Sequence, residues 1–155
     1  MICGLTYLGL GEEQKAIEDF NRAIELKPDS DYARAFYNLG LSHFKLNNYR
    51  KALENFTKFI NFGNNDENAY SKRALVNFSL NNYQEAIEDY SHAIELNPHN
   101  ADSYKMRGIS YLQQSMKPAM IDLHKAAIIH QEQGDMDDYE SVQEIINFIN
   151  LINKT

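Results

Sequence analysis

The sequence has little of what secreted, membrane-spanning or nucleic-acid-binding proteins need. Its single cysteine, Cys3, cannot form an internal disulfide, so nothing indicates a secreted disulfide-stabilised domain. No apolar run approaches the roughly eighteen residues of a membrane span, and the first residues lack the charged segment of a signal peptide. The net charge of −7 is opposite to the basic surface that nucleic-acid binding requires. We therefore expect a cytoplasmic protein that binds neither nucleic acid nor membranes.

Turn-forming residues are also scarce. Three prolines and seven glycines among 155 residues leave little room for a β-rich fold with many tight turns. Tryptophan is absent, whereas ten tyrosines and eight phenylalanines are present, and 43% of the residues are hydrophobic. This composition suffices for one domain with a sizeable core.

The centre of the chain predicts two amphipathic helices joined by a turn. Apolar residues recur at three- and four-residue steps over 68–80 and again over 83–96. Asn81 and Asn82 form the turn, because asparagine tolerates the left-handed backbone conformation. Pro98 ends the second helix. Such a hairpin cannot bury its own apolar face and needs similar hairpins beside it.

The same pattern recurs with a period near 34 residues. The first-helix positions recur at Phe36, Tyr70 and Tyr104, and at Gly40, Ala74 and Gly108. Such a period is typical of a helical solenoid. Phe59 stands where the other repeats have alanine, and the sequence leaves open whether its ring pushes the next helix outward or fills a gap.

These residues resemble the tetratricopeptide repeat (TPR) family, whose pattern is an aromatic, Leu-Gly and a second aromatic, followed by Ala, an aromatic, Ala and Pro. The resemblance covers about residues 1–130 and implies an all-α, right-handed superhelical solenoid of helix-turn-helix repeats. Four repeats are expected, at about 1–30, 31–66, 67–100 and 101–130. The first of them is truncated at its start. Pro28 closes the first repeat, and Asp31 is the expected N-cap of the next.

Beyond the repeats, polar residues 131–136 predict a loop and residues 137–153 a last helix. This helix carries an apolar stripe, Val142, Ile145, Ile146, Ile149 and Ile152, which Phe148 and Leu151 widen. A C-terminal capping helix would cover the stacking face of the last repeat. The alternative is a dimerisation helix, because the apolar arc is wider than one contact surface needs.

The sequence does not predict an enzyme. No HExxH, GxSxG, phosphate-binding glycine loop or CxxC motif occurs, and no two of the five histidines have metal-ligand spacing. We interpret His43 as a packing residue and His124 as a solvated one. Neither a metal nor a cofactor is predicted.

The resemblance instead implies a protein-binding groove lined by the first helix of each repeat. The residues expected there are Arg34, Tyr37, Asn38, Leu41, Lys45, Asn68, Ser71, Lys72, Leu75, Lys105, Met106 and Ile109. We expect these cations to have Asp102 as their only acidic neighbour. A basic, partly apolar surface suits an extended peptide with apolar anchors and acidic groups or a free C-terminal carboxylate.

The function predicted from sequence is therefore a non-enzymatic adaptor or scaffold that binds a protein or peptide. One alternative is a self-associating structural array, such as a homodimer, formed through the truncated first repeat and the last helix. A second alternative is binding of a chaperone C-terminal tail, which a TPR subclass holds with a five-residue clamp. Asn38 and Lys72 partly match two of the five clamp positions.

Overall fold

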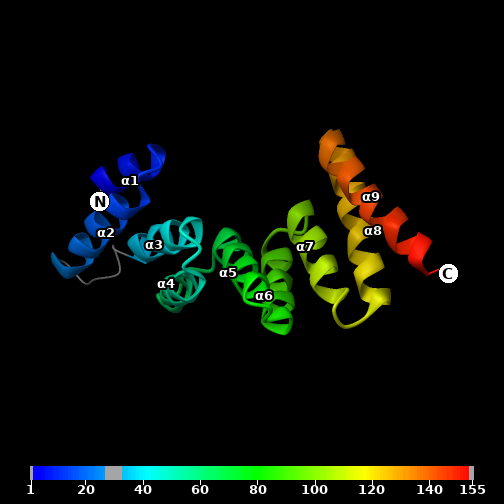
Figure 1. Cartoon of the computed structure of the whole chain (residues 1–155), viewed down its shortest axis with the longest axis horizontal. Coiled ribbons are helices and arrows are strands. Elements are labelled where there is room, and N and C mark those ends of the chain that lie inside the picture. The colour runs from blue at the N-terminus through cyan, green and yellow to red at the C-terminus, as the bar shows by residue number, and fades with distance from the viewer. Residues whose placement is uncertain (1, 27–32, 154–155) are drawn as a thin grey trace. The chain divides into compact units, whose positions relative to one another are not determined.

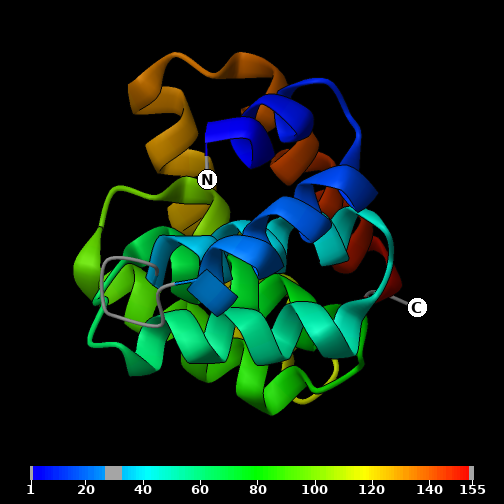
Figure 2. The same ribbon diagram turned by 90° about the vertical axis from the view of Figure 1, so that its left-hand side faces the viewer.

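The computed structural model describes residues 2–26 and 33–153, and within these ranges every regular element is an α-helix (Figures 1 and 2). The helices are α1 (Ile2–Gly9), α2 (Glu13–Leu26), α3 (Ala33–Lys45), α4 (Tyr49–Asn61), α5 (Glu67–Ser79), α6 (Tyr83–Leu96), α7 (Ala101–Tyr111), α8 (Met116–Gln133) and α9 (Met136–Ile152). The predicted all-α fold is confirmed. Pro28 and Asp31, the expected boundary between the first two repeats, lie outside the described residues.

None of the helices in the described part of the chain combines the length and the apolar composition that crossing a membrane requires.

The chain reverses direction between the two helices of a repeat at asparagines in the left-handed conformation, as predicted. Asn47 and Asn81 have φ angles of 58° and 62°, a region that asparagine enters more readily than most residues. After α3, the Asn47 N–H donates to the Phe44 carbonyl at 2.9 Å and the Asn48 N–H to the His43 carbonyl at 2.8 Å. These local bonds satisfy carbonyls at the helix end, so the reversal between α3 and α4 is encoded within a few residues.

The structure divides into two compact units, Met1–Asn81 and Asn82–Thr155, which we call unit 1 and unit 2. Unit 1 contains α1 to α5 and unit 2 contains α6 to α9. Within each unit every helix packs against the next one in the chain, and α3 also contacts α5. Each unit is described below by itself.

Glycine allows the two helices of a repeat to approach closely in unit 1. A Cβ atom added at Gly40 on α3 would lie 2.7 Å from Cε1 of Phe56 on α4. A Cβ atom added at Gly4 on α1 would likewise lie 2.7 Å from Cε1 of Phe20 on α2. Both rings are fully buried. A residue larger than glycine would therefore displace a core ring at either position.

Phe59 fills a gap rather than pushing a helix outward. Its ring is buried among the small side chains of Ala33 on α3 and Ala69 on α5. It also packs against Tyr37, with the ring centroids 5.3 Å apart. The two alanines supply the space that a phenylalanine at this repeat position needs.

Unit 2 has an aliphatic core between its last two helices, which run side by side in Figure 1. Its buried members are Leu123, Ala126 and Ala127 of α8 and Val142, Ile146 and Ile149 of α9. On the outer edge of α9, Phe148 and Leu151 are 65% and 64% exposed. Ile152, which the sequence places in the buried stripe, is exposed as well. The apolar arc of α9 is thus wider than the surface that α8 covers.

The predicted loop at 131–136 is too long. Helix α8 continues to Gln133, and α9 already begins at Met136. Residues such as glutamine and glutamate are good helix formers despite their polarity, so the helix persists until a glycine stops it. Gly134 adopts a left-handed φ of 81°, and the Asp135 N–H then donates to the His130 carbonyl at 2.9 Å. This is the usual glycine-terminated helix end.

Candidate functional site

Helices α3 and α5 of unit 1 carry most of the residues predicted to bind a partner. Those spaced three or four apart share one face of their helix, and the two helices contact each other. Tyr37, Leu41, Ser71 and Leu75 are half-buried, whereas Arg34, Lys45, Asn68 and Lys72 are exposed. The predicted residues of unit 1 therefore combine an apolar floor with polar and cationic side chains.

Tyr37 is the fixed part of this floor. Its ring packs edge-on against Phe56, with the centroids 5.6 Å apart, and against Phe59. Burial, followed by the nearby carboxylate of Asp66, raises the pKa of the Tyr37 phenol, while Arg34 opposes the rise. The phenol is therefore neutral near pH 7 and can donate a hydrogen bond.

Asn38 presents little surface to a partner. It is 7% exposed, and its backbone carbonyl accepts a hydrogen bond from the Ser42 hydroxyl at 3.0 Å. Of the two residues that match the chaperone-tail clamp, Lys72 is exposed and Asn38 is buried. The described surface thus offers one of the two matching side chains.

The predicted cations differ in their surroundings. Lys45 Nζ lies 2.9 Å from Glu13 Oε1 on α2. Arg34 and Lys72 are exposed and form no ion pair with any other residue in the described ranges. The expectation that Asp102 is the only acidic neighbour of the predicted cations is therefore wrong, because it overlooked carboxylates on other helices.

In unit 2, Lys105 on α7 is already bound by two carboxylates. Its Nζ lies 2.9 Å from Asp102 Oδ1 and 3.3 Å from Asp138 Oδ1 on α9. Burial lowers the pKa of the Lys105 ammonium, but hydrogen bonds and charge attraction from the two aspartates outweigh it and raise the pKa. Met106 and Ile109 on the same helix are half-buried. The α7 surface therefore offers apolar area and an already neutralised cation.

An arginine missed by the sequence analysis joins three helices of unit 2. Arg107 on α7 forms a two-bonded ion pair with Asp122 on α8, through Nε–Oδ2 at 2.7 Å and Nη2–Oδ1 at 2.9 Å. Its Nη1 donates to Ser91 Oγ on α6 at 2.9 Å. The hydrogen bonds to Asp122 raise the pKa of Arg107 despite its burial. No local motif marks this bridge, because its partners come from separate helices.

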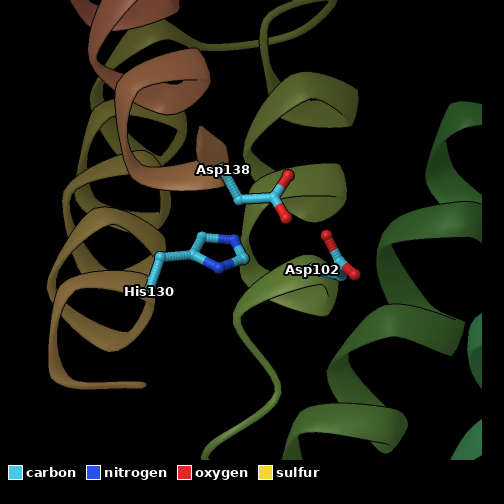
Figure 3. Close-up of side chains that lie close together, drawn as sticks. All are labelled: Asp102, His130 and Asp138. Carbon is cyan, nitrogen blue, oxygen red and sulfur yellow. The ribbon is translucent and has the colours of Figure 1, made fainter. Parts of the chain in front are cut away.

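A second set of residues was missed for the same reason. Asp102, His130 and Asp138 come from α7, α8 and α9, and one ligand atom of each lies within 4.8 Å of the other two (Figure 3). No short motif links them, because they are 28 and 8 residues apart in the chain. The packing of α7, α8 and α9 in unit 2 brings these side chains together.

His43 and His124, the two histidines that the sequence analysis interpreted, have the surroundings predicted for them. His43 is buried on α3, and burial, followed by the charge of Lys51, lowers its pKa, whereas Glu54 opposes this. His124 on α8 is exposed. His43 is therefore a packing residue and His124 a solvated one.

Comparisons with known proteins agree with this fold. Two family models described as tetratricopeptide repeat match residues 67–100 and 33–66, and one described as TPR repeat matches residues 4–47. Among curated proteins no sequence match was found.

Solved structures include similar helical repeats. The crystal structure of MamA protein has a TM-score of 0.77 and 26% identity, over 85% of this chain and 72% of that one. MamA from residue 41 to its end, from Desulfovibrio magneticus RS-1, has a TM-score of 0.75 and 19% identity, over 98% and 92%. YrrB, described as a TPR protein with an unusual peptide-binding site, has a TM-score of 0.79 and 22% identity, over 91% and 71%.

The last two likenesses concern the fold alone, whereas the family models read the repeat residues themselves. The matched models cover the repeats of unit 1 and extend into α6. Proteins with these repeats are generally non-catalytic modules that bind other proteins or peptides. This chain belongs to the tetratricopeptide repeat family.

Proposed function

We propose that this chain is a non-enzymatic adaptor that binds an extended peptide on the face of α3 and α5. The observation that carries the proposal is the pair of exposed cations, Arg34 and Lys72, which have no ion-pair partner in the described part of unit 1. They accompany a half-buried apolar floor that includes Tyr37, Leu41 and Leu75. Elsewhere on the predicted surface, Lys45 and Lys105 are already neutralised.

The chemistry of this face selects the class of peptide. Two cations that have no ion-pair partner among the described residues attract carboxylates, and charge-assisted hydrogen bonds to them are about twice as strong as neutral ones. The apolar floor suits one or two hydrophobic anchor side chains, and an extended peptide presents such side chains at alternate positions. We therefore expect an acidic peptide or a free C-terminal carboxylate beside apolar residues.

The test is a charge reversal with a matched control. Peptides selected from a displayed random library are measured by fluorescence polarisation against the wild type and against the double variant Arg34→Glu, Lys72→Glu. We expect the double variant to lose at least about tenfold in affinity, since each charged contact contributes about 1 kcal/mol or more. The control is Arg22→Glu, Lys51→Glu, which reverses two exposed cations on α2 and α4.

The control variant should bind like the wild type. Amidation of the peptide C-terminus separates a carboxylate end from internal acidic residues as the recognised group. If both double variants bind equally well, the face of α3 and α5 is not the binding surface.

A specific observation also favours self-association as a second function. Phe148, Leu151 and Ile152 on α9 are exposed, as is Leu5 on α1, and exposed apolar groups of this size often mark contact surfaces. Light scattering over a range of concentrations should show a dimer that Phe148→Glu with Leu151→Glu converts to a monomer. A wild type that stays monomeric at the highest concentration would remove this function.

A further inference from the structure

Three potential metal ligands of unit 2 meet where α8 turns into α9 (Figure 3). Asp102 lies in the first turn of α7, His130 near the end of α8 and Asp138 in the first turn of α9. In Figure 3 the imidazole ring of His130 is directed toward both carboxylates. The arrangement brings one nitrogen and two oxygen ligands together from three helices.

His130 is buried and has no hydrogen-bond partner among the residues that the structure describes. It is 4% exposed, and neither Nδ1 nor Nε2 makes a hydrogen bond to any described residue. Oδ2 of Asp135 lies 4.0 Å from Nδ1, too far for a hydrogen bond. A buried polar group without a partner costs free energy and is rare in folded proteins. A metal ion bound by both the imidazole and the two aspartates would give the ring the polar partner that it lacks among the described residues.

The two carboxylates can close around an ion by side-chain rotation. The side chains of Asp102 and Asp138 are 71% and 55% exposed, so their rotamers are not fixed by packing. Ligands of a tetrahedral zinc ion lie about 2.0–2.1 Å from the metal and therefore about 3.4 Å from one another. The ligand atoms of the three residues lie up to 4.8 Å apart. The carboxylate oxygens must therefore move toward the ring nitrogen by about the difference between this separation and the 3.4 Å of a zinc site.

Lys105 shows that these carboxylates already hold a cation jointly. Its ammonium binds Oδ1 of both Asp102 and Asp138. A divalent ion would bring twice the charge, and it would also bind an imidazole nitrogen of His130, which forms no hydrogen bond within the described ranges. The ammonium is therefore a competitor that a metal ion must displace.

We propose that Asp102, His130 and Asp138 form a binding site for a divalent transition-metal ion, with Zn²⁺ as the best fit. One imidazole and two carboxylates, with a further position for water, match the ligand types and number of zinc sites. Mg²⁺ and Ca²⁺ prefer sites made entirely of oxygen ligands. The bound ion would tie α7, α8 and α9 together. This site is independent of peptide binding on unit 1.

Zinc binding should be detectable by calorimetric titration and as a rise in the melting temperature. Titration of Zn²⁺ into chelator-treated protein by calorimetry should show one site per chain. At a free concentration of about one hundred times Kd, Zn²⁺ should raise the melting temperature by about 5–10 °C, because the ion binds the folded state. Co²⁺ in place of Zn²⁺ should show the visible absorption of a site with nitrogen and oxygen ligands.

Matched variants assign the signal to these residues. His130→Gln should weaken Zn²⁺ binding at least a hundredfold, and Asp138→Asn at least tenfold. The controls are His124→Gln on α8 and Asp137→Asn on α9, which change exposed residues of the same types on the same helices. Both controls should bind Zn²⁺ like the wild type. Each titration is repeated with Cys3→Ser, which removes the single thiol of the chain.

The proposal is overturned by any of three results. These are no one-site binding by the wild type, unchanged binding by Asp138→Asn, or binding that disappears with Cys3→Ser. Circular dichroism shows whether His130→Gln still folds. If it does not, Asp138→Asn decides the question, because Asp138 is exposed and its loss should leave the fold intact.

Discussion

Unit 1 and unit 2 use related repeats but join their helices with different chemistry. In unit 1 aromatic rings pack in pairs: Phe36 stacks on Phe62 with the ring centroids 5.6 Å apart, and Phe44 meets Tyr49 at a tilt with the centroids 5.7 Å apart. In unit 2 an aliphatic core lies between α8 and α9, and the ion pair of Arg107 and Asp122 connects α7 with α8. Both units thus contain helical hairpins of the same pattern, but the side chains that hold neighbouring helices together differ: aromatic rings in unit 1, aliphatic side chains and an ion pair in unit 2.

This difference has physical consequences. Ring packing contributes mainly through buried apolar area, so it is sensitive to volume and insensitive to salt. A buried ion pair is sensitive to the loss of either partner, because the remaining charge stays away from water. Substitutions in unit 1 should therefore lower the free energy of unfolding through lost buried volume. Substitutions of the ion pair in unit 2 should lower it by leaving a charge without its partner.

The largest effect is expected from Phe56→Ala in unit 1. The ring is fully buried against Gly40 and Tyr37, and removing such a ring costs about 3–5 kcal/mol. Urea unfolding followed by circular dichroism measures the change in the free energy of unfolding. Phe62→Ala is the control, since Phe62 is 46% exposed and stacks on Phe36; it should cost about 1 kcal/mol. Equal costs would contradict the importance of the buried ring.

A smaller loss is expected from Asp122→Ala in unit 2. It leaves the guanidinium of Arg107 without its two-bonded partner in a mostly buried position, at a cost of about 2–3 kcal/mol. Arg107→Met combined with Asp122→Ala should cost less than the sum of the two single variants. Additive costs in this double-mutant cycle would show that the pair is not coupled.

The equivalent glycines of the two units should respond differently to alanine. At Gly40 the new Cβ would lie 2.7 Å from the Phe56 ring, so Gly40→Ala should cost about 1–2 kcal/mol even after the gain in helix propensity. At Gly108 the nearest atoms, the Ala119 carbonyl oxygen and Leu123 Cγ, are at 3.1 Å. Gly108→Ala should remain within about 1 kcal/mol of the wild type. The reverse order in thermal unfolding would contradict this reading of the two interfaces.

The smallest expected effect is a pH dependence that originates in His43 of unit 1. Burial and Lys51 lower the pKa of His43 in the folded chain, while Glu54 opposes them. Below the ordinary histidine pKa of about 6.5, the unfolded chain binds a proton that the folded chain resists, so the free energy of unfolding falls as the pH drops.

His43→Leu should reduce this slope between about pH 7 and pH 5. His124→Gln, at an exposed position, should leave the slope unchanged. A slope that is the same in all three proteins would assign the pH dependence to other groups.

The parts of the fold that depend on neighbours in sequence were predictable. The helices expected over 68–80 and 83–96 correspond to Glu67–Ser79 and Tyr83–Leu96. The left-handed Asn47 and Asn81 follow from the tolerance of asparagine for that conformation. Where the prediction relied on polarity alone, at residues 131–136, it was wrong, because glutamine-rich segments continue a helix until glycine ends it.

The candidate site was predictable only in part. Helical periodicity identified the face that carries Tyr37, Leu41, Lys72 and Leu75, since residues on one face follow from spacing. It could not identify which cations are neutralised by other helices. The partner of Lys45 is on α2, and one partner of Lys105 is on α9.

The sequence by itself determined the repeat, the helices and the turns, because these depend on side-chain period and on backbone preferences that act over a few residues. Only the tertiary structure decided that Arg34 and Lys72 lack ion-pair partners among the described residues, and that a ring nitrogen of His130 lies within 4.8 Å of carboxylate oxygens of Asp102 and Asp138. Charge neutralisation and ligand geometry depend on distances of a few ångströms between helices. Those distances are set by how the side chains of separate helices fill the space between them.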